Sequence, residues 1–283
     1  MVNIKHIVVA PQLITPQWPA PDNIVALSSC RSGGVSTQAY SSLNLADHVG
    51  DSERHVAENR KILQQHCKGL ERIQWLNQVH GTDVFSIDCS IDCSIDIVTM
   101  DNILMDGTLV ESLPATEPAA DSCTTQHVGL ACAVMAADCL PVLFCDATGE
   151  QIAAAHAGWR GLVAGVLENT VQHFSCDPHQ IMVWLGPAIG PQQFEVGSEV
   201  RQVFLDAATA GQQLMITEAF EPSINNGGYY FADLYQLARI RLQHMGIDSI
   251  YGGDFCTYRD QQQFFSYRRD GITGRMVTLI YKS

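Results

Sequence analysis

The sequence has little positive charge. It contains 16 Lys and Arg residues against 30 Asp and Glu residues, which gives a formal net charge of −14. Nucleic acids and anionic membranes bind basic surfaces, so this composition argues against both as partners. Any anion that binds must therefore be held locally, by a few arginines and backbone N–H groups.

The sequence also lacks long apolar runs, export signals and linkers. No run approaches the length of a membrane-spanning helix, and the first six residues lack the basic-then-apolar pattern of a signal peptide. Its ten cysteines are dispersed over 283 residues, which favours reduced thiols and a cytoplasmic protein. Strands and helices alternate without a break in composition, so we predict one α/β domain over residues 1–283. Residues 1–23 form its N-terminal strand and Pro-rich segment.

The segment from Gly129 to Gly161 is the most informative part of the chain. Short, unbroken apolar runs at Val128–Met135, Pro141–Phe144 and Ile152–Ala155 predict buried strands. Around them we also expect a strand at Ile73–Val79, a polar loop at Thr116–Thr125, a helix at Leu162–Phe174 and a strand at Phe264–Tyr267.

Three chemically active side chains lie where predicted strands end, namely His80, Cys139 and His156. Each alone is ordinary, because buried cysteines and strand-end histidines are common. Together they match a known ligand set for catalytic zinc, with a fourth position open. A second interpretation makes Cys139 a nucleophile deprotonated by a histidine, with Asp138 or Asp106 orienting the base. The residues alone leave both open.

Several arginines could hold an anion. Arg160 lies between glycines at the start of a predicted helix, where backbone N–H groups already favour negative charge. An equally simple alternative is a surface arginine that packs on Trp159. Arg31 precedes a Gly-Gly turn and Arg268 lies near the C-terminus. For these two, a solvated turn and a solvated edge strand are the simpler interpretations.

The segment Ser86–Asp96 is a four-residue repeat, S-I-D-C-S-I-D-C-S-I-D. Two cysteines four residues apart and three aspartates suggest a metal site. A short tandem duplication in a loop or hairpin explains the repeat more simply, so we do not count its cysteines as ligands.

An ordered set of motifs resembles the YfiH-type laccase-domain family. The resemblance runs from about Ile24 to the end of the chain, and the repeat is outside the family pattern. The motifs are Arg31-Ser-Gly-Gly-Val-Ser36, Ser42-Leu-Asn-Leu45, Glu58-Asn-Arg60, Gln78-Val-His-Gly81, Ala137-Asp-Cys-Leu-Pro141, His156-Ala-Gly-Trp-Arg-Gly161, Gly186-Pro-Ala-Ile-Gly190, Phe265-Ser-Tyr-Arg-Arg269 and Thr273-Gly-Arg275.

This resemblance implies a four-layer α/β/β/α fold with mixed sheets, of the YfiH/CNF-like type, and zinc bound by His80, Cys139 and His156. It also implies a purine nucleoside enzyme that phosphorolyses adenosine, inosine and methylthioadenosine and deaminates adenosine. Family members were first called polyphenol oxidases or multicopper laccases, and some bacterial members are linked to editing of peptidoglycan precursors. A Cys/His hydrolase is therefore the main competing enzyme, and a non-enzymatic purine-binding protein is a third possibility.

The implied reactions need an acid and an anion site. Zinc lowers the pKa of a bound water, which rationalises deamination, and Asp106 or Asp138 is the candidate to protonate the departing ammonia. Asp106 lies in Met105–Val110, our match to a D-A/G-L-V-T segment of the family. Arg160, with Arg31 or Arg268, would hold phosphate.

Copper-dependent oxidation is the weakest of these activities. Multicopper oxidation needs several histidine-rich sites, and the chain has ten histidines and no H-x-H pair. We expect zinc in the site, with copper binding as an adventitious alternative.

Overall fold

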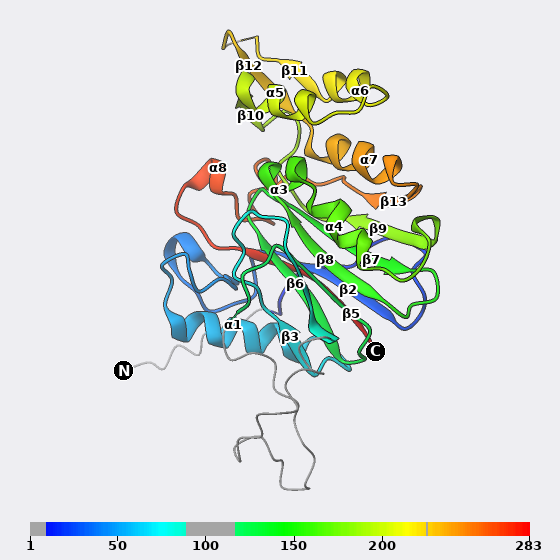
Figure 1. Cartoon of the computed structure of the whole chain (residues 1–283). Coiled ribbons are helices and arrows are strands. Elements are labelled where there is room, and N and C mark those ends of the chain that lie inside the picture. Colours follow the sequence, from blue (N-terminus) through cyan, green and yellow to red (C-terminus); the bar gives the residue numbers. More distant parts are fainter. Residues whose placement is uncertain (1–9, 89–116, 225) are drawn as a thin grey trace, which may run out of the picture.

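The computed structural model describes residues 10–88, 117–224 and 226–283. Its framework is two packed β-sheets (Figure 1). The five-stranded sheet has the order β1 (Leu13–Ile14), β2 (Ile24–Ser29), β14 (Met276–Lys282), β6 (Leu130–Ala136) and β3 (Arg72–Gln74). The six-stranded sheet has the order β13 (Ser249–Gly252), β9 (Ile181–Leu185), β7 (Leu140–Asp146), β8 (Ile152–Ala157), β5 (Ser122–Thr125) and β4 (Val84–Ser86).

Helices cover the outer faces of both sheets, which gives the predicted four layers. Helix α1 (Glu53–Gln65) buries Ile62 and Leu63 against the five-stranded sheet. Helices α3 (Trp159–Ala164), α4 (Val166–Gln172) and α7 (Leu234–His244) pack on the six-stranded sheet. A third apolar cluster, containing Val134 and Leu143, fills the space between the sheets. The predicted α/β/β/α fold class is confirmed.

A smaller unit extends this framework. It consists of a three-stranded sheet, β10 (Glu195–Gly197), β12 (Tyr229–Ala232) and β11 (Phe220–Pro222), with helices α5 (Ser198–Asp206) and α6 (Gln213–Glu218). It lies at the top of Figure 1 next to α7. The remaining elements are α8 (Tyr267–Asp270) and the 3₁₀ turns η1 (Gln38–Tyr40) and η4 (Pro178–Gln180).

Two predicted elements are wrong because local bonding overrides composition. Residues 122–125 of the expected polar loop form the buried strand β5, because the Ser122 and Thr124 hydroxyls donate to backbone carbonyls of β8. The strand expected at Phe264–Tyr267 is instead a loop followed by α8, where Arg269 binds the carbonyls of Thr257, Tyr258 and Phe264.

Two further elements are shorter or interrupted. The helix expected over 162–174 is two helices, because Gly165 adopts φ +106° between them. The strand expected to run to Val79 ends at Gln74, and His80 has φ +59°. Residues 4–9 and most of the 86–96 repeat lie outside the described residues. No helix in the described part of the chain is long and apolar enough to cross a membrane. The single-domain assignment stays a prediction.

Candidate metal centre

The register of β7 and β8 brings Cys139 next to His156. These antiparallel strands pair Pro141 with His156, so Cys139, one residue before β7, faces Gly158. A Cβ atom on Gly158 would lie 3.0 Å from Sγ of Cys139 and 3.1 Å from Cδ2 of His80. Glycine at this position therefore leaves the space in which the three side chains meet.

His80 enters this space from the loop that follows β3. Its Nε2 lies 3.9 Å from Sγ of Cys139, and its ring meets that of His156 edge-on at a centroid distance of 4.9 Å. One ligand atom from each of the three residues lies within 4.8 Å of the other two. His156 is 3% exposed, whereas His80 is exposed and Cys139 half-buried. The three residues can hold a metal ion.

The metal-free site favours a thiolate next to an imidazolium. Burial opposes ionisation of Cys139, but the charge and hydrogen bonds of His156 and His80 outweigh it and lower the pKa of the thiol to about 6. Burial likewise opposes charge on His156, but Cys139 and Asp121 raise its pKa to about 9. The thiolate is the form of cysteine that binds metal.

Asp121 lies behind the histidines, and the sequence did not single it out. Its Oδ1 accepts a hydrogen bond from Nδ1 of His156 at 2.8 Å, because β5 and β8 pair Ser122 with Ala155 and so place Asp121 opposite His156. Burial raises the pKa of Asp121, but bonds from His156 and backbone N–H groups outweigh burial and lower it.

A signal for Asp121 was present in the sequence. The segment Asp121-Ser-Cys-Thr-Thr125 also places an aspartate directly before a short strand. It is therefore an alternative to Met105–Val110 as the match to the D-A/G-L-V-T segment of the family. The polar composition of residues 116–125 predicts a loop instead, which hides this aspartate.

The two acids predicted as proton donors are placed differently. Asp138 lies in the crossover from β6 to β7, with φ +98°. Both of its carboxylate oxygens are bonded, Oδ1 to the Thr257 hydroxyl at 2.6 Å and Oδ2 to the backbone N–H of Arg268 at 2.7 Å. Asp138 therefore ties the crossover to the C-terminal segment. Asp106 lies outside the described residues.

The three potential ligands line a cavity of about 380 Å³, and Tyr267 and Arg275 also line it. Only Nη1 of Arg275 is bonded within the described part of the chain, to the carbonyls of Thr273 and Gly274. Burial lowers the pKa of Arg275, and the negative charges of Cys139 and Asp138 oppose that shift. Arg275 occurs in the Thr-Gly-Arg motif, but the sequence gave no reason to place it beside Cys139.

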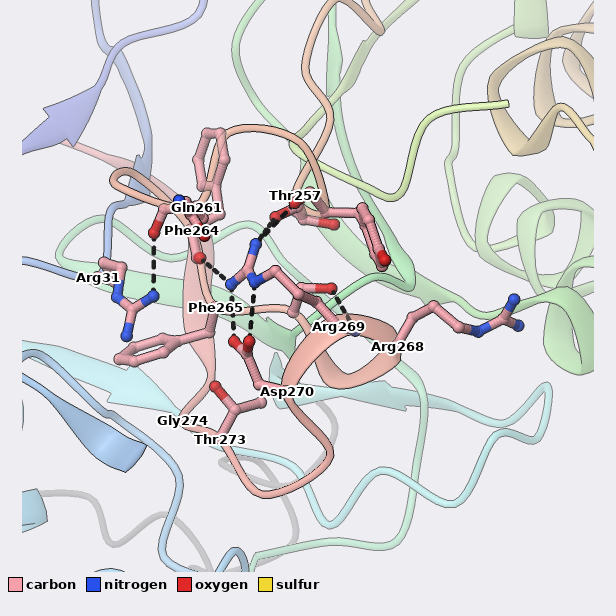
Figure 2. A network of polar contacts seen from close by, with 12 residues as sticks. Arg31, Thr257, Gln261, Phe264, Phe265, Arg268, Arg269, Asp270, Thr273 and Gly274 are labelled. Atoms are coloured by element: carbon pink, nitrogen blue, oxygen red, sulfur yellow. Dashed lines mark hydrogen bonds and ion pairs between the residues drawn. The ribbon is translucent and has the colours of Figure 1, made fainter. Parts of the chain in front are cut away.

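The three arginines predicted to hold phosphate do not line this cavity. The Arg160 guanidinium lies 4.3 Å over the Trp159 ring, as in the alternative interpretation. Arg31 donates to the Ser41 and Gln261 carbonyls. Arg268 donates to the Glu195 carbonyl. Figure 2 shows the Arg268 side chain pointing away from the Arg269–Asp270 pair.

A larger cavity of about 560 Å³ lies between α7 and residues 253–259. Its arginines are already paired, Arg239 with the Gly252 carbonyl at 2.6 Å and Arg259 with Asp260 at 2.9 Å. Within the described residues, the one cluster that could ligate a metal is His80, Cys139 and His156. The smaller cavity is therefore the better candidate for chemistry.

Comparison with known proteins gives a consistent picture. A family described as multi-copper polyphenol oxidoreductase laccase matches residues 25–283. The chain is similar to a protein of Escherichia coli (strain K12) named purine nucleoside phosphorylase YfiH, with 46% identity over 270 residues, 95% of this chain and 98% of that protein. It is 44% identical to the Pseudomonas aeruginosa purine nucleoside phosphorylase PA4543, over 95% of this chain and 97% of that protein.

Solved structures show the same architecture. The Neisseria meningitidis protein NMB0706 superposes with a TM-score of 0.81 and 43% identity, covering 96% of this chain and 99% of that one. Bacillus licheniformis YfiH superposes with a TM-score of 0.75 and 28% identity, covering 92% and 93% of the two chains.

Proposed function

The chain belongs to the family described as multi-copper polyphenol oxidoreductase laccase, and from that premise we propose that it is a metal-dependent purine nucleoside phosphorylase. The family resemblance expected from the sequence is thereby confirmed. The observation that carries the proposal is the cavity in which His80, Cys139 and His156 share one space with Arg275. Its volume of about 380 Å³ falls in the range of about 300–1,000 Å³ that is usual for small-molecule sites.

The donor set favours zinc. One thiolate and two imidazoles suit zinc, with copper a weaker alternative. A zinc ion held by His80, Cys139 and His156 would supply a Lewis acid at the floor of the cavity. Gly158 supports a metal ion at this place, whatever its identity, because a Cβ atom there would enter the space between the three side chains.

Phosphorolysis needs an anion held against the sugar. A phosphate oxygen forms a bond to C1′, the C1′–N9 bond breaks, and its electron pair passes to the purine. Nε and Nη2 of Arg275 have no acceptor within the described residues, so they can donate to phosphate as a fork. Arg275 would thus hold the attacking phosphate beside the metal-ligating residues.

The other lining residues suit a nucleoside. Tyr267 is 60% exposed and lines the cavity, so its ring can stack on a purine base. We propose adenosine, inosine and methylthioadenosine as substrates. Deamination of adenosine would be a second reaction at the same site. The eight described cysteines are free thiols, which supports a cytoplasmic enzyme.

The test is incubation of the purified protein with each nucleoside, with and without phosphate, followed by mass spectrometry. We expect the free base and a pentose phosphate, formed only when phosphate is present and suppressed by a chelator. Adenosine incubated without phosphate tests deamination, with inosine and ammonia as the expected products. Binding of nucleosides without any product would instead indicate a purine-binding protein.

A Cys/His hydrolase acting on peptidoglycan precursors is the second candidate. It is favoured by the order Cys139, His156, Asp121, a nucleophile and base followed by a carboxylate that orients the base. Metal analysis of untagged protein separates the two functions. Hydrolysis of a muropeptide precursor by protein without stoichiometric metal would support the hydrolase and contradict the metal-dependent phosphorylase.

A further inference from the structure

Asp121 is a fully buried carboxylate that accepts four hydrogen bonds. Its Oδ1 accepts from Nδ1 of His156 at 2.8 Å and from the backbone N–H of His80 at 3.0 Å. Its Oδ2 accepts from the backbone N–H groups of Val79 at 3.1 Å and Gly81 at 2.6 Å. One side chain is therefore bonded to both histidines of the candidate metal centre.

The bond to His156 fixes the orientation of that ring. Because Nδ1 points at Asp121, the other ring nitrogen, Nε2, is left for the metal. Asp121 immediately precedes β5 and lies opposite His156 of β8, and the backbone N–H of His156 donates to the Asp121 carbonyl at 2.7 Å. The His156 side chain is thus held from behind by a rigid part of the sheet.

The bonds to residues 79–81 fix the loop that carries His80. Three consecutive backbone N–H groups converge on one carboxylate, as they do around bound anions. His80 itself has φ +59°, a conformation that a non-glycine residue keeps only when its surroundings hold it there. Without the carboxylate, the three N–H groups lose their acceptor in a partly buried place.

We propose that Asp121 is a positioning residue that holds His80 and His156 as one unit, so that loss of its charge loosens both histidines together. The inference rests on the proposed metal site, but it is independent of which reaction that site catalyses. Asparagine at 121 would be a poor substitute. Whichever way its amide is turned, the NH₂ group replaces one oxygen and faces two of the four N–H donors.

The experiment compares Asp121→Asn with Asp83→Asn. Asp83 is exposed, and its backbone carbonyl accepts a hydrogen bond from the Asp121 N–H at 3.1 Å, so substitution of its side chain removes the same charge close by without touching a histidine. Zinc affinity is measured by competition with a chromophoric chelator. We expect the zinc dissociation constant of Asp121→Asn to rise by roughly 10–100-fold, the usual effect of losing a partner of a metal-binding histidine, and that of Asp83→Asn to stay within about twofold. Equal zinc affinity in wild type and Asp121→Asn would overturn the proposal.

A second measurement uses metal-free wild-type protein and does not depend on the variant folding. Nitrogen-15 NMR should show the His156 proton on Nδ1 in a strong hydrogen bond, and hydrogen exchange should show protected N–H groups at 79–81. Rapid exchange at all three positions would contradict the proposal. Neither measurement uses a nucleoside. If the protein fails to cleave nucleosides but shows these signals, the proposed activity is wrong and the role of Asp121 stands.

Discussion

The cavity has a metal wall, formed by His80, Cys139 and His156 with Asp121 behind them, and an arginine wall, formed by Tyr267 and Arg275. In the metal wall the positioning groups are bonded within the protein, since Asp121 alone accepts four hydrogen bonds. In the arginine wall, by contrast, Arg275 uses only Nη1 for internal bonds within the described residues. Tyr267 is 60% exposed.

This difference separates two tasks. A preorganised set of donors binds a metal ion with little rearrangement, which keeps the cost of binding low. A guanidinium with unused donors gains its bonds only when an anion arrives. For the phosphorylase proposed above, the metal wall would be assembled before substrate binds, and phosphate would complete the arginine wall. Substitutions in the metal wall should consequently lower metal binding, whereas substitutions in the arginine wall should lower kcat/KM for phosphate.

The largest effect is expected for Cys139→Ala. Loss of the Cys139 thiolate should remove stoichiometric zinc and lower nucleoside phosphorolysis by on the order of 10³-fold or more. Elemental analysis and a phosphorolysis assay measure the two effects. Cys176→Ala is the control, because Cys176 is a half-buried free thiol outside the cavity lining. A Cys139→Ala protein that keeps both metal and activity would remove the basis for the metal wall.

Arg275→Ala should lower the activity while the protein keeps its metal. Hydrogen bonds to a charged group contribute about 1.5–3 kcal/mol, so we expect kcat/KM for phosphate to fall roughly 10–100-fold while zinc content stays unchanged. Arg275→Lys should recover part of the loss, because it restores the charge without the planar fork. Steady-state kinetics at varied phosphate concentration measures this. Loss of zinc in Arg275→Ala would show that the two walls are not separate.

The metal wall was predictable in part because its strands are short apolar runs. Those runs located Cys139 and His156 correctly beside strands, and the family resemblance joined them to His80. Their convergence depends on the register between β7 and β8, and the position of Asp121 on that between β5 and β8. The register between two strands depends on the geometry of their connection and on which faces become buried, and a single sequence does not display either directly.

The arginine wall was missed for a related reason. A strand is expected at Phe264–Tyr267, whereas Arg269 bonds the carbonyls of Thr257, Tyr258 and Phe264, and the segment is a loop that leads into α8. Which arginine faces the cavity then depends on these long-range bonds. Composition indicated an anion site with few arginines, but it could not choose among them.

Gly158→Ala should sharpen the comparison by disturbing only the metal wall. The backbone at Gly158 has φ −61°, which alanine tolerates, but its Cβ would lie 3.0 Å from Sγ of Cys139. We expect zinc affinity to fall about tenfold, within the range seen when a metal-binding group is displaced by its surroundings. Chelator competition measures it. Gly211→Ala, whose Cβ meets nothing within 4 Å, is the control. Unchanged zinc affinity would mean that the three donors do not need this space.

Arg160→Ala should have the smallest effect, and it decides between two locations for the anion site. The sequence placed a possible phosphate site at the start of α3, but the Arg160 guanidinium lies over Trp159, outside the cavity lining. An exposed cation–π contact contributes about 0.5–1 kcal/mol to stability, so we expect a slightly lower melting temperature and a KM for phosphate within about twofold of wild type. A rise in KM as large as that of Arg275→Ala would place phosphate at the helix start.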